Sequence, residues 1–386
     1  MSVFLDLSKA FDTINHTILI TKMENMGIRG IAKLWFESYL GDRQQFMNIY
    51  DINSPTENIR CGVPQGSILG PILFLIYIND IHNASDLQLL SFADDTTISY
   101  SSPDIDNIYL KMNNELEALS QWFSANKLCL NVSKTKYIVF RPSVRYKNLD
   151  NYNLKINDLV IERIGNNSPT KSFKFLGIHV DETTSWKAHI DHVSKKISKC
   201  NYVINKIKNV LPMACLHLLY HSIIQCHINY GIKVWGGSTA IGRITKLQKK
   251  SIRIINRKTY NYHTEPLFKY NRILKVTDQY QYDISLFMHN MKLNKVPQSF
   301  HTFAYFTPPT RPTRQSHVAN MTRARTTFSS HLPLHKFPQT WNALEQAVRA
   351  INITSKFKRV LHAYFINKYL ENVRCNNIRC IQCFPV

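Results

Sequence analysis

The sequence is poor in acidic residues and contains no long apolar run and no secretory signal, and each shortage excludes a class of protein. Only 26 Asp and Glu stand against 48 Lys and Arg among 386 residues, which gives a net charge of +22. The longest uncharged apolar run, at residues 70–78, is too short to span a bilayer and contains a proline. No charged segment followed by an apolar one opens the chain, as a signal peptide would require. We therefore expect an intracellular protein of the cytoplasm and nucleus with no membrane partner.

Metal-binding and nucleophilic signatures are also sparse. The eight cysteines are scattered, which suits a reducing compartment. Cys375, Cys380 and Cys383 lie near the C-terminus, but structural zinc normally has four ligands, and no histidine lies between or after them. His189 and His192 lie three residues apart on a predicted helix, where packing of one ring in the core explains them as well as a ligand role does. There is no internal repeat, glycine-rich phosphate loop or Ser/His/Asp arrangement, so the sequence predicts neither zinc nor these kinds of catalysis.

The charge is distributed unevenly along a chain that is long enough for two or three domains. Residues 1–150 hold 13 Lys and Arg against 16 Asp and Glu, whereas residues 151–386 hold 35 against 10. A slightly acidic N-terminal part followed by a strongly basic C-terminal part is expected of a protein that couples a metal-using site to a polyanion-binding surface. The alternative is a basic protein with incidental clustering. The pattern favours nucleic acid as the partner.

Strand and helix patterns alternate in the first half of the chain, and helical patterns dominate the second. A strand-like run ends at Asp6, and a helix follows, with Asp12 as its expected N-cap and Gly27 as its stop. Further elements expected before residue 185 are paired strands at 44–62, a loop and apolar helix at 62–81, a hairpin at 87–99, a helix at 105–127, a strand at 136–140 and a strand or hairpin at 173–180. Those expected after it are helices at 185–211 and 215–235, a basic linker at 299–335 and an amphipathic helix at about 339–370.

The stretch SFADDTTIS, residues 91–99, places Asp94 and Asp95 side by side between two half-buried strands. Short carboxylates are common in turns, so turn chemistry would explain an isolated pair. Asp6 supplies a third carboxylate if the strand that it ends lies beside this hairpin. Carboxylates this close repel each other unless cations neutralise them, and Mg²⁺ prefers such hard oxygen ligands. The three aspartates therefore predict a two-metal clamp suited to attack on a phosphoryl group, with two Mg²⁺ ions or with Mn²⁺ in their place.

Five motifs give these aspartates a context. FLDLSKAFD, GVPQGSILGPILFLIYINDI, FADD, LNVSKTKYIVF and FLGI follow one another over residues 3–182. Their order and spacing resemble the palm of reverse transcriptases, most of all those of non-LTR retrotransposons of the jockey-like group. The segment LHLLYHSIIQCHINYGIKVWG is similar to the thumb of the same elements. Each motif is weak by itself, but five in register favour the catalytic interpretation of the aspartate pair over turn chemistry.

The resemblance implies roles for the residues of the first and third motifs. Asp6, Asp94 and Asp95 are implied to be catalytic and to hold the metal ions, with the backbone carbonyl of Leu7 as a further ligand. Phe11 is implied to lie under the incoming sugar and to reject a 2′-hydroxyl by steric contact. The alternative for Phe11 is an aromatic side chain of the core.

The second and fourth motifs carry further implied roles. Gln65 and Gly66 would contact the nucleotide and the template base, where glycine permits close backbone approach. The alternative is an ordinary Pro-Gln-Gly turn. Lys134 or Lys136 would protonate the leaving pyrophosphate, and an ordinary surface lysine explains either position equally well.

Two more groups complete the implied nucleic-acid contacts. Phe175, Leu176 and Gly177 resemble the primer grip. A lysine-rich helix follows, and its basic side chains are expected to form a nucleic-acid face: Lys195, Lys196, Lys199, Lys206 and Lys208.

The predicted fold class is α+β, with a reverse-transcriptase palm, in which helices back an antiparallel sheet, followed by an all-α thumb and a helical C-terminal extension. The expected domains are a palm at 1–143, a connection with the primer-grip hairpin at 144–182, a thumb at 183–260 and a basic extension at 261–386. The implied function is RNA-directed DNA polymerisation, a nucleotidyl transfer from a dNTP to a primer 3′-hydroxyl. The implied partners are an RNA template, a DNA primer or target DNA, and dNTPs; the oligomeric state stays open.

Two alternatives and one expectation about length accompany this prediction. The chain could be a related palm polymerase, such as an intron maturase, or a catalytically dead remnant that binds nucleic acid. Met1 lies five residues before Asp6. We therefore expect an N-terminally truncated fragment that lacks the fingers and the endonuclease of the family, and whose activity alone is uncertain.

Overall fold

The structure is a computed structural model that describes residues 1–141, 149, 151–303, 306, 318–321, 323–324, 327–330 and 332–369. The three C-terminal cysteines and much of the expected basic linker lie outside these residues. The chain divides into two compact units: Met1–Phe173 with Asp181–Thr184, and Lys174–Val180 with Ser185–Val386. Among the described residues, no helix combines the length and the apolar composition needed to cross a membrane.

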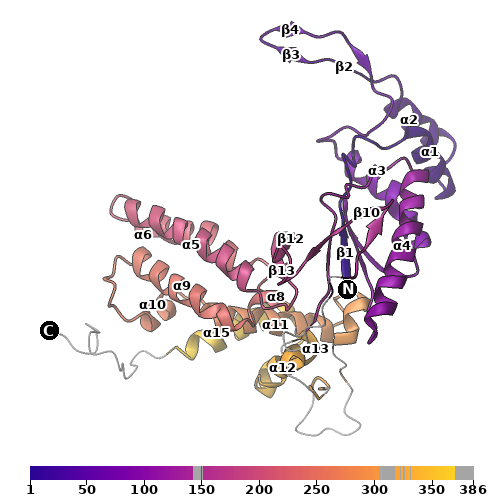
Figure 1. The fold of residues 1–386 in the computed structure, drawn as a ribbon. Helices are drawn as coiled ribbons and strands as arrows, with labels where there is room; N and C mark the ends of the chain where they lie inside the picture. Colours follow the sequence, from indigo (N-terminus) through magenta and orange to yellow (C-terminus); the bar gives the residue numbers. More distant parts are fainter. Residues whose placement is uncertain are drawn as a thin grey trace. The chain divides into compact units, whose positions relative to one another are not determined.

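The first unit is built on a five-stranded sheet (Figure 1). Its strands, in spatial order, are β11 (Glu162–Ile164), β8 (Lys136–Ile138), β1 (Ser2–Leu5), β7 (Asp95–Ser99) and β6 (Gln88–Phe92). The three pairs β8–β1, β1–β7 and β7–β6 are antiparallel, but β11 pairs with β8 in parallel. The expectation of a purely antiparallel sheet is therefore wrong at this edge. β11 enters the sheet at the end at which β8 begins, since Glu162 pairs with Lys136 and Ile164 with Ile138, so the two strands run in the same direction.

Helices cover one face of this sheet. They are α1 (His16–Asn25), α3 (Leu69–Ile78) and α4 (Ile105–Ala125), and α2 (Ile31–Leu40) packs on α1. Because side chains alternate along a strand, Val3 and Leu5 of β1 point into the core with these helices. Asp6 continues this alternation on the opposite face.

Short strand pairs account for the other β-structure of the described residues. β2 (Gln44–Gln45) pairs with β5 (Glu57–Asn58), and β3 (Asn48–Ile49) pairs with β4 (Ile52–Asn53), which confirms the paired strands expected at 44–62. β9 (Lys155–Ile156) pairs with β10 (Leu159–Val160), and β12 (Ser172–Phe175) pairs with β13 (Ile178–Asp181). The helix, hairpin and strand expected between residues 87 and 140 are likewise confirmed.

The second unit is helical apart from the tip of the β12–β13 hairpin, within its described residues. Its long helices are α5 (Lys187–Ile207), α9 (Gly242–Ile255), α11 (Val276–Lys292), α13 (Pro333–Asn342) and α15 (Thr354–Asn367). Shorter ones are α6 (Met213–Leu219), a π-helix (Tyr220–Gln225), α7 (Cys226–Asn229), α8 (Ile232–Trp235), α10 (Glu265–Tyr270), α12 (Thr327–Ser330) and α14 (Gln346–Arg349). Three 3₁₀ turns complete the described helical structure of the chain: Asn79–Ala84, Thr239–Ile241 and Gln298–Phe303.

One apolar core runs through this unit, and it explains why the single helix expected at 339–370 is wrong. Trp341 of α13, Val348 of α14 and Phe357 of α15 are all buried in that core. Extended backbone at Glu345 and Ile353 separates the three helices. A straight helix would carry these side chains away from each other along its axis, whereas two bends return each apolar face to the same core.

Candidate functional site

Asp6 lies directly after the central strand, on the face of the sheet that the helices leave open. The register of β1 and β7 pairs Leu5 with Thr96, so the next position places Asp6 opposite Asp95. The backbone of Asp6 is held from the other side, because its carbonyl accepts a hydrogen bond from the Asn131 amide at 2.8 Å. The side chain of Asp6 is 36% exposed, so it is open to a ligand.

The β6–β7 hairpin brings the other two carboxylates to the same place. Phe92 pairs with Asp95, and the turn between them consists of Ala93 and Asp94. Ala93 adopts a positive φ of 52°, which tight two-residue hairpin turns require. Asp94 is exposed and Asp95 is half-buried. The structure therefore brings together all three aspartates that the sequence singled out.

The three carboxylates influence one another electrostatically. Burial raises the pKa of Asp95 above its ordinary value, and the negative charges of Asp94 and Asp6 raise it further. This is the response expected when anionic oxygens gather without enough positive charge between them.

Lys134 and Lys136 differ in their surroundings, although the sequence could not separate them. The ammonium nitrogen of Lys134 lies 3.9 Å from a carboxylate oxygen of Asp6 and is largely exposed. Lys136 points elsewhere: it donates a hydrogen bond to the Ser133 carbonyl at 2.8 Å and forms an ion pair with Glu162 of β11. Only Lys134 of these two therefore lies beside the carboxylates.

The backbone of Leu7 is also oriented by its neighbours. The Asp6 carbonyl and the Ser8 amide both bond to the segment 129–131. Backbone groups of an extended chain alternate between its two edges. The Leu7 carbonyl is thus directed to the opposite edge, on which β7 and its aspartates lie.

The donor set suits a divalent cation, since three anionic oxygens with mutual repulsion are the groups that Mg²⁺ or Mn²⁺ would stabilise. As placed in the structure, however, no three His, Cys, Asp or Glu side chains of the described residues converge on one point as metal ligands would. Binding would therefore require these aspartate side chains to rotate toward the ion. Asp6, Asp94 and Asp95 would hold it, with the Leu7 carbonyl at the same edge.

Phe11 and the Gln65 loop lie next to each other. The Phe11 ring is half-buried and packs on Phe74 of α3, with ring centroids 4.8 Å apart. The Phe11 carbonyl accepts a hydrogen bond from the Val63 amide at 2.9 Å, and the Gln65 side-chain amide donates to Asp12 at 2.7 Å. Two motifs separated by about fifty residues are thus joined by backbone and side-chain bonds.

Sequence reasoning missed Asp12 and Gly62 as parts of this arrangement. Asp12 was expected to cap α1, but the capping bond comes from Asn15, whose side chain accepts from the Ile18 amide, while Asp12 binds Gln65. Gly62 has a φ of +89°, and a Cβ there would lie 2.8 Å from the Asp12 carbonyl oxygen. The signal in the sequence was the glycine that directly precedes the VPQG stretch.

The sequence of this region matches a known family. A family model described as reverse transcriptase (RNA-dependent DNA polymerase) matches residues 1–180. The RNA-directed DNA polymerase from mobile element jockey of Drosophila melanogaster is 24% identical over 319 residues, which cover 78% of this chain and 33% of that protein. The probable RNA-directed DNA polymerase from transposon BS of the same species is 27% identical over 271 residues, 66% of this chain and 28% of that protein. Residues 1–180 are therefore similar to the reverse transcriptase family.

The chain spans about a third of the length of these curated relatives, at 33% and 28%. The probable RNA-directed DNA polymerase from transposon X-element of Drosophila melanogaster is also covered only in part: it is 26% identical over 66% of this chain and 28% of that protein. A solved structure of telomerase from Candida albicans, in complex with a fragment of telomeric RNA, covers 76% of this chain and 44% of that chain. Its TM-score of 0.29 and 12% identity are too low to carry a structural argument.

The residues expected to form a primer grip lie in the turn of the β12–β13 hairpin. Phe175 ends β12, and Leu176 and Gly177 follow with positive φ values of 43° and 81°. The Leu176 carbonyl accepts a hydrogen bond from the Tyr230 hydroxyl at 2.6 Å. The turn is therefore fixed by a side chain of the helical unit to which it belongs.

The expected lysine face lies on α5. Lys195, Lys199 and Lys206 recur on one side of this helix and are exposed. The buried residues of α5 lie on the opposite side: Ile190, Val193, Ile197 and Ile204. Lys196 is exposed beside this row, and Lys208, which follows the last residue of α5, is half-buried.

The paired histidines of α5 belong to a cluster of three rings rather than to a metal site. His189 is 2% exposed, and its Nδ1 accepts a hydrogen bond from the His179 amide at 3.3 Å. The ring centroids of His179 and His192 lie 4.8 Å apart. The packing interpretation of His189 is therefore confirmed, because its ring is buried in the helical unit.

This cluster predicts a loss of stability in mild acid. Burial lowers the pKa of His189 to about 4, and it also lowers the pKa values of His179 and His192. Between pH 6.5 and 4 the unfolded chain therefore binds protons that the folded chain does not, so stability present at neutral pH is lost as the pH falls. For His189 the loss should reach roughly 2–3 kcal/mol near pH 4. Hydrogen exchange of the α5 amides between pH 7 and 5 measures it, and a His189→Gln variant with the same pH dependence as wild type would contradict it.

Proposed function

We propose that the chain is the polymerase part of an RNA-directed DNA polymerase, which transfers a nucleotide from a dNTP to the 3′-hydroxyl of a DNA primer or target DNA on an RNA template. The observation that carries this proposal is the position of Asp6 opposite Asp95, with Asp94 in the adjoining turn. In this proposal residues 1–143 are the palm, 144–182 are the connection with the primer-grip hairpin, 183–260 are the thumb and 261–386 are a basic extension.

The aspartates act as ligands and as a negative surface that must be neutralised. When bound, two divalent ions would supply the positive charge that stabilises the attacking oxygen and the leaving pyrophosphate. The raised pKa of Asp95 supports this role, because a carboxylate between two others gains most from a nearby cation.

Lys134 is the better candidate for the proton donor. Its ammonium group lies beside Asp6 and is exposed, so it could deliver a proton to the pyrophosphate as that group leaves. The ion pair of Lys136 with Glu162 occupies that side chain. We therefore assign the general-acid role to Lys134 in this proposal.

Phe11, Gln65 and Gly66 would contact the incoming nucleotide. The aromatic ring of Phe11 is supported from behind by Phe74, which makes it a rigid surface for a sugar. Gln65 is exposed and held by Asp12, and Gly66 has a φ of +85° with open space at the position that a Cβ would take. A template base or a nucleotide could approach the backbone closely there.

Primer extension by a protein that contains residues 1–386 tests the proposal. With a DNA primer on an RNA template, dNTPs and Mg²⁺, we expect extension that stops when the ion is chelated. Preference for DNA templates would favour another palm polymerase. Binding of template and primer without extension would favour a catalytically dead remnant.

Replacing Phe11 by valine should raise ribonucleotide incorporation relative to deoxyribonucleotide incorporation by up to about 10²-fold, the scale on which apolar contacts discriminate a hydroxyl. Single-nucleotide insertion with matched ribo- and deoxyribonucleoside triphosphates measures the ratio. Phe74→Leu is the control, because it disturbs the same ring contact from the core side. If a folded Phe11→Val protein discriminated between the two sugars as the wild type does, Phe11 would be an ordinary aromatic side chain of the core.

Neutralising the lysine face should weaken nucleic-acid binding in a salt-dependent way. In the full chain, changing Lys195, Lys199 and Lys206 to glutamine should reduce the slope of log affinity against log salt by about 2 for single strands, since each phosphate contact contributes roughly 0.7. Filter binding over a series of salt concentrations measures the slope. The matched control changes three exposed cations of α15: Lys356, Lys358 and Arg359. Equal slopes for both triple variants would contradict a specific face.

A further inference from the structure

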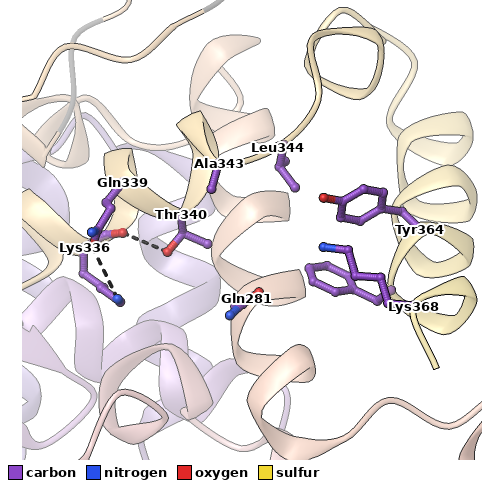
Figure 2. Close-up of a pocket in the computed structure, with 9 residues that line it drawn as sticks. Gln281, Lys336, Gln339, Thr340, Ala343, Leu344, Tyr364 and Lys368 are labelled. Atoms are coloured by element: carbon purple, nitrogen blue, oxygen red, sulfur yellow. Dashed lines mark hydrogen bonds between the residues drawn. The ribbon is translucent and has the colours of Figure 1, made fainter. Parts of the chain in front are cut away.

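A small pocket opens between three helices of the second unit (Figure 2). Its volume is about 250 Å³, and its lining comes from α11, from α13 and α15, and from the residues that directly follow the last two helices. The helices are fixed by large side chains on their buried sides, among them Trp341, Phe357 and Leu361. The pocket walls are therefore held by the core of the unit.

The lining combines positive charge with amides and one aromatic ring. Of the nine described residues that line the pocket, two are lysines and none is acidic. Gln281, Gln339 and Thr340 add neutral groups that can donate and accept hydrogen bonds. An anion can thus enter without meeting a carboxylate.

The charged side chains of the pocket are positioned by their neighbours. The ammonium nitrogen of Lys368 lies 3.9 Å from the centroid of the Tyr364 ring and 5.4 Å from that of Phe365. Lys336 donates to the Gln339 side-chain carbonyl at 3.3 Å, as the dashed line in Figure 2 marks. Figure 2 also shows Tyr364 and Lys368 extending from the α15 side of the pocket toward α11 and α13, with Gln281 facing them from α11. Cations placed in this way lose little side-chain entropy when they bind an anion.

We propose that this pocket binds one unpaired nucleotide of a single-stranded RNA or DNA. Lys336 and Lys368 would contact its phosphate, Tyr364 would stack on its base, and Gln281 and Gln339 would bond to the base edge. The volume is just below the usual range for small-molecule sites, so it admits one nucleotide and excludes a base pair. Aromatic side chains beside cationic groups are the usual elements of single-strand binding.

The composition of the pocket favours a nucleotide over an acidic peptide. Both ligands would pair with the lysines and accept hydrogen bonds from the two glutamine side chains, but only a nucleotide base offers a flat ring on which Tyr364 can stack. The excess of basic residues in 151–386 also favours a polyanion. This assignment does not depend on polymerase chemistry, because it concerns binding alone.

Four variants of the full chain test the proposal with an oligouridylate of about a dozen nucleotides. Lys336→Gln with Lys368→Gln should weaken binding about tenfold and reduce the salt slope by roughly 1.4. Tyr364→Leu should weaken binding several-fold without changing the slope, because no charge is lost. Lys356→Gln with Lys358→Gln removes the same charge from exposed positions of α15 outside the pocket, and Lys368→Arg retains the charge over the ring. These last two should bind nearly as the wild type does.

Competition and crosslinking identify the ligand. Uridine 5′-monophosphate should displace the oligonucleotide better than uridine or inorganic phosphate does alone, and 4-thiouridine RNA should crosslink to the peptide that contains Tyr364. The proposal would be overturned if the Lys336/Lys368 double variant and the Lys356/Lys358 double variant lost the same affinity while Tyr364→Leu bound as the wild type does. Displacement by oligoglutamate but not by the nucleotide would assign the pocket to an acidic peptide and overturn it as well.

Discussion

Replacing Asp94 by asparagine is expected to reduce primer extension by at least about 10³-fold while leaving affinity for template and primer within a few fold. The residue lies in the exposed turn between β6 and β7, so the change removes a charge without removing core packing. Catalytic metals supply several kcal/mol of transition-state stabilisation, and each 1.36 kcal/mol corresponds to a factor of ten in rate. Nucleic-acid binding should persist, because it depends on the basic side chains.

Two further measurements make this prediction specific. Asp86→Asn, at an exposed position before β6, is the matched control and should extend primers normally. The titration of Asp95, followed by NMR of its labelled carboxyl carbon, gives a readout apart from activity. Since the charge of Asp94 raises the pKa of Asp95, removing that charge should lower this pKa. Near wild-type extension by Asp94→Asn, or an unchanged Asp95 titration, would contradict a shared carboxylate site.

The position of the three aspartates could be predicted from the sequence, because it depends on short-range pattern. A strand that ends in Asp6 and a hairpin with Asp94 in its turn need only be adjacent for the carboxylates to meet, and the alternation of side chains then decides the face. The elements of residues 87–140 are marked by clear periodicity and turn residues, and they were predicted correctly.

The choice between Lys134 and Lys136 could not be predicted, because it depends on a contact distant in sequence. Lys136 pairs with Glu162, and Glu162 reaches it only because β11 adds to the sheet in parallel beside β8. No local pattern encodes that crossover. The same limit applies to the region after residue 339, where a shared core bends the chain into three helices that helical periodicity alone had joined.

The hydrogen bond between Asp12 and Gln65 is a third feature that could not be predicted from the sequence. Local reasoning assigned Asp12 to the N-cap of α1, since aspartate before an apolar helical pattern is a standard start signal. Asn15 performs that role, and Asp12 is available to hold the loop that carries Gln65. Asparagine and aspartate cap helices about equally well, so local propensity alone could not show that the helix begins after Asn15 rather than after Asp12.

Replacing Gly62 by alanine should destabilise the first unit by about 2–5 kcal/mol. A φ of +89° costs a residue with a side chain roughly 1–3 kcal/mol, and the new Cβ would lie 2.8 Å from the carbonyl oxygen and 3.0 Å from the α-carbon of Asp12. Backbone atoms cannot move aside as a side chain can. The Gly62 amide also donates to the Ile14 carbonyl at 2.8 Å, and the Gly62 carbonyl accepts from His16 at 2.7 Å, so the glycine is held from both sides.

Gly66→Ala separates the cost of the positive φ from the cost of the collision with Asp12. Both variants force alanine into a positive φ, but only Gly62→Ala also brings a Cβ against the backbone of Asp12. Gly66 has a nearly equal φ of +85°, but no heavy atom lies within 4 Å of the position that its Cβ would take. We expect Gly66→Ala to cost only the 1–3 kcal/mol of the dihedral, and Gly62→Ala to cost more by the energy of the backbone collision. Hydrogen exchange of peptides that cover residues 11–16 and 61–70 measures both variants in the same unit. Faster exchange in Gly62→Ala should extend to the Phe11 segment, because the Val63 amide and the Phe11 carbonyl would separate. Equal protection in the two variants would show that the loop is not pressed against Asp12, and that Gln65 reaches its position without this glycine.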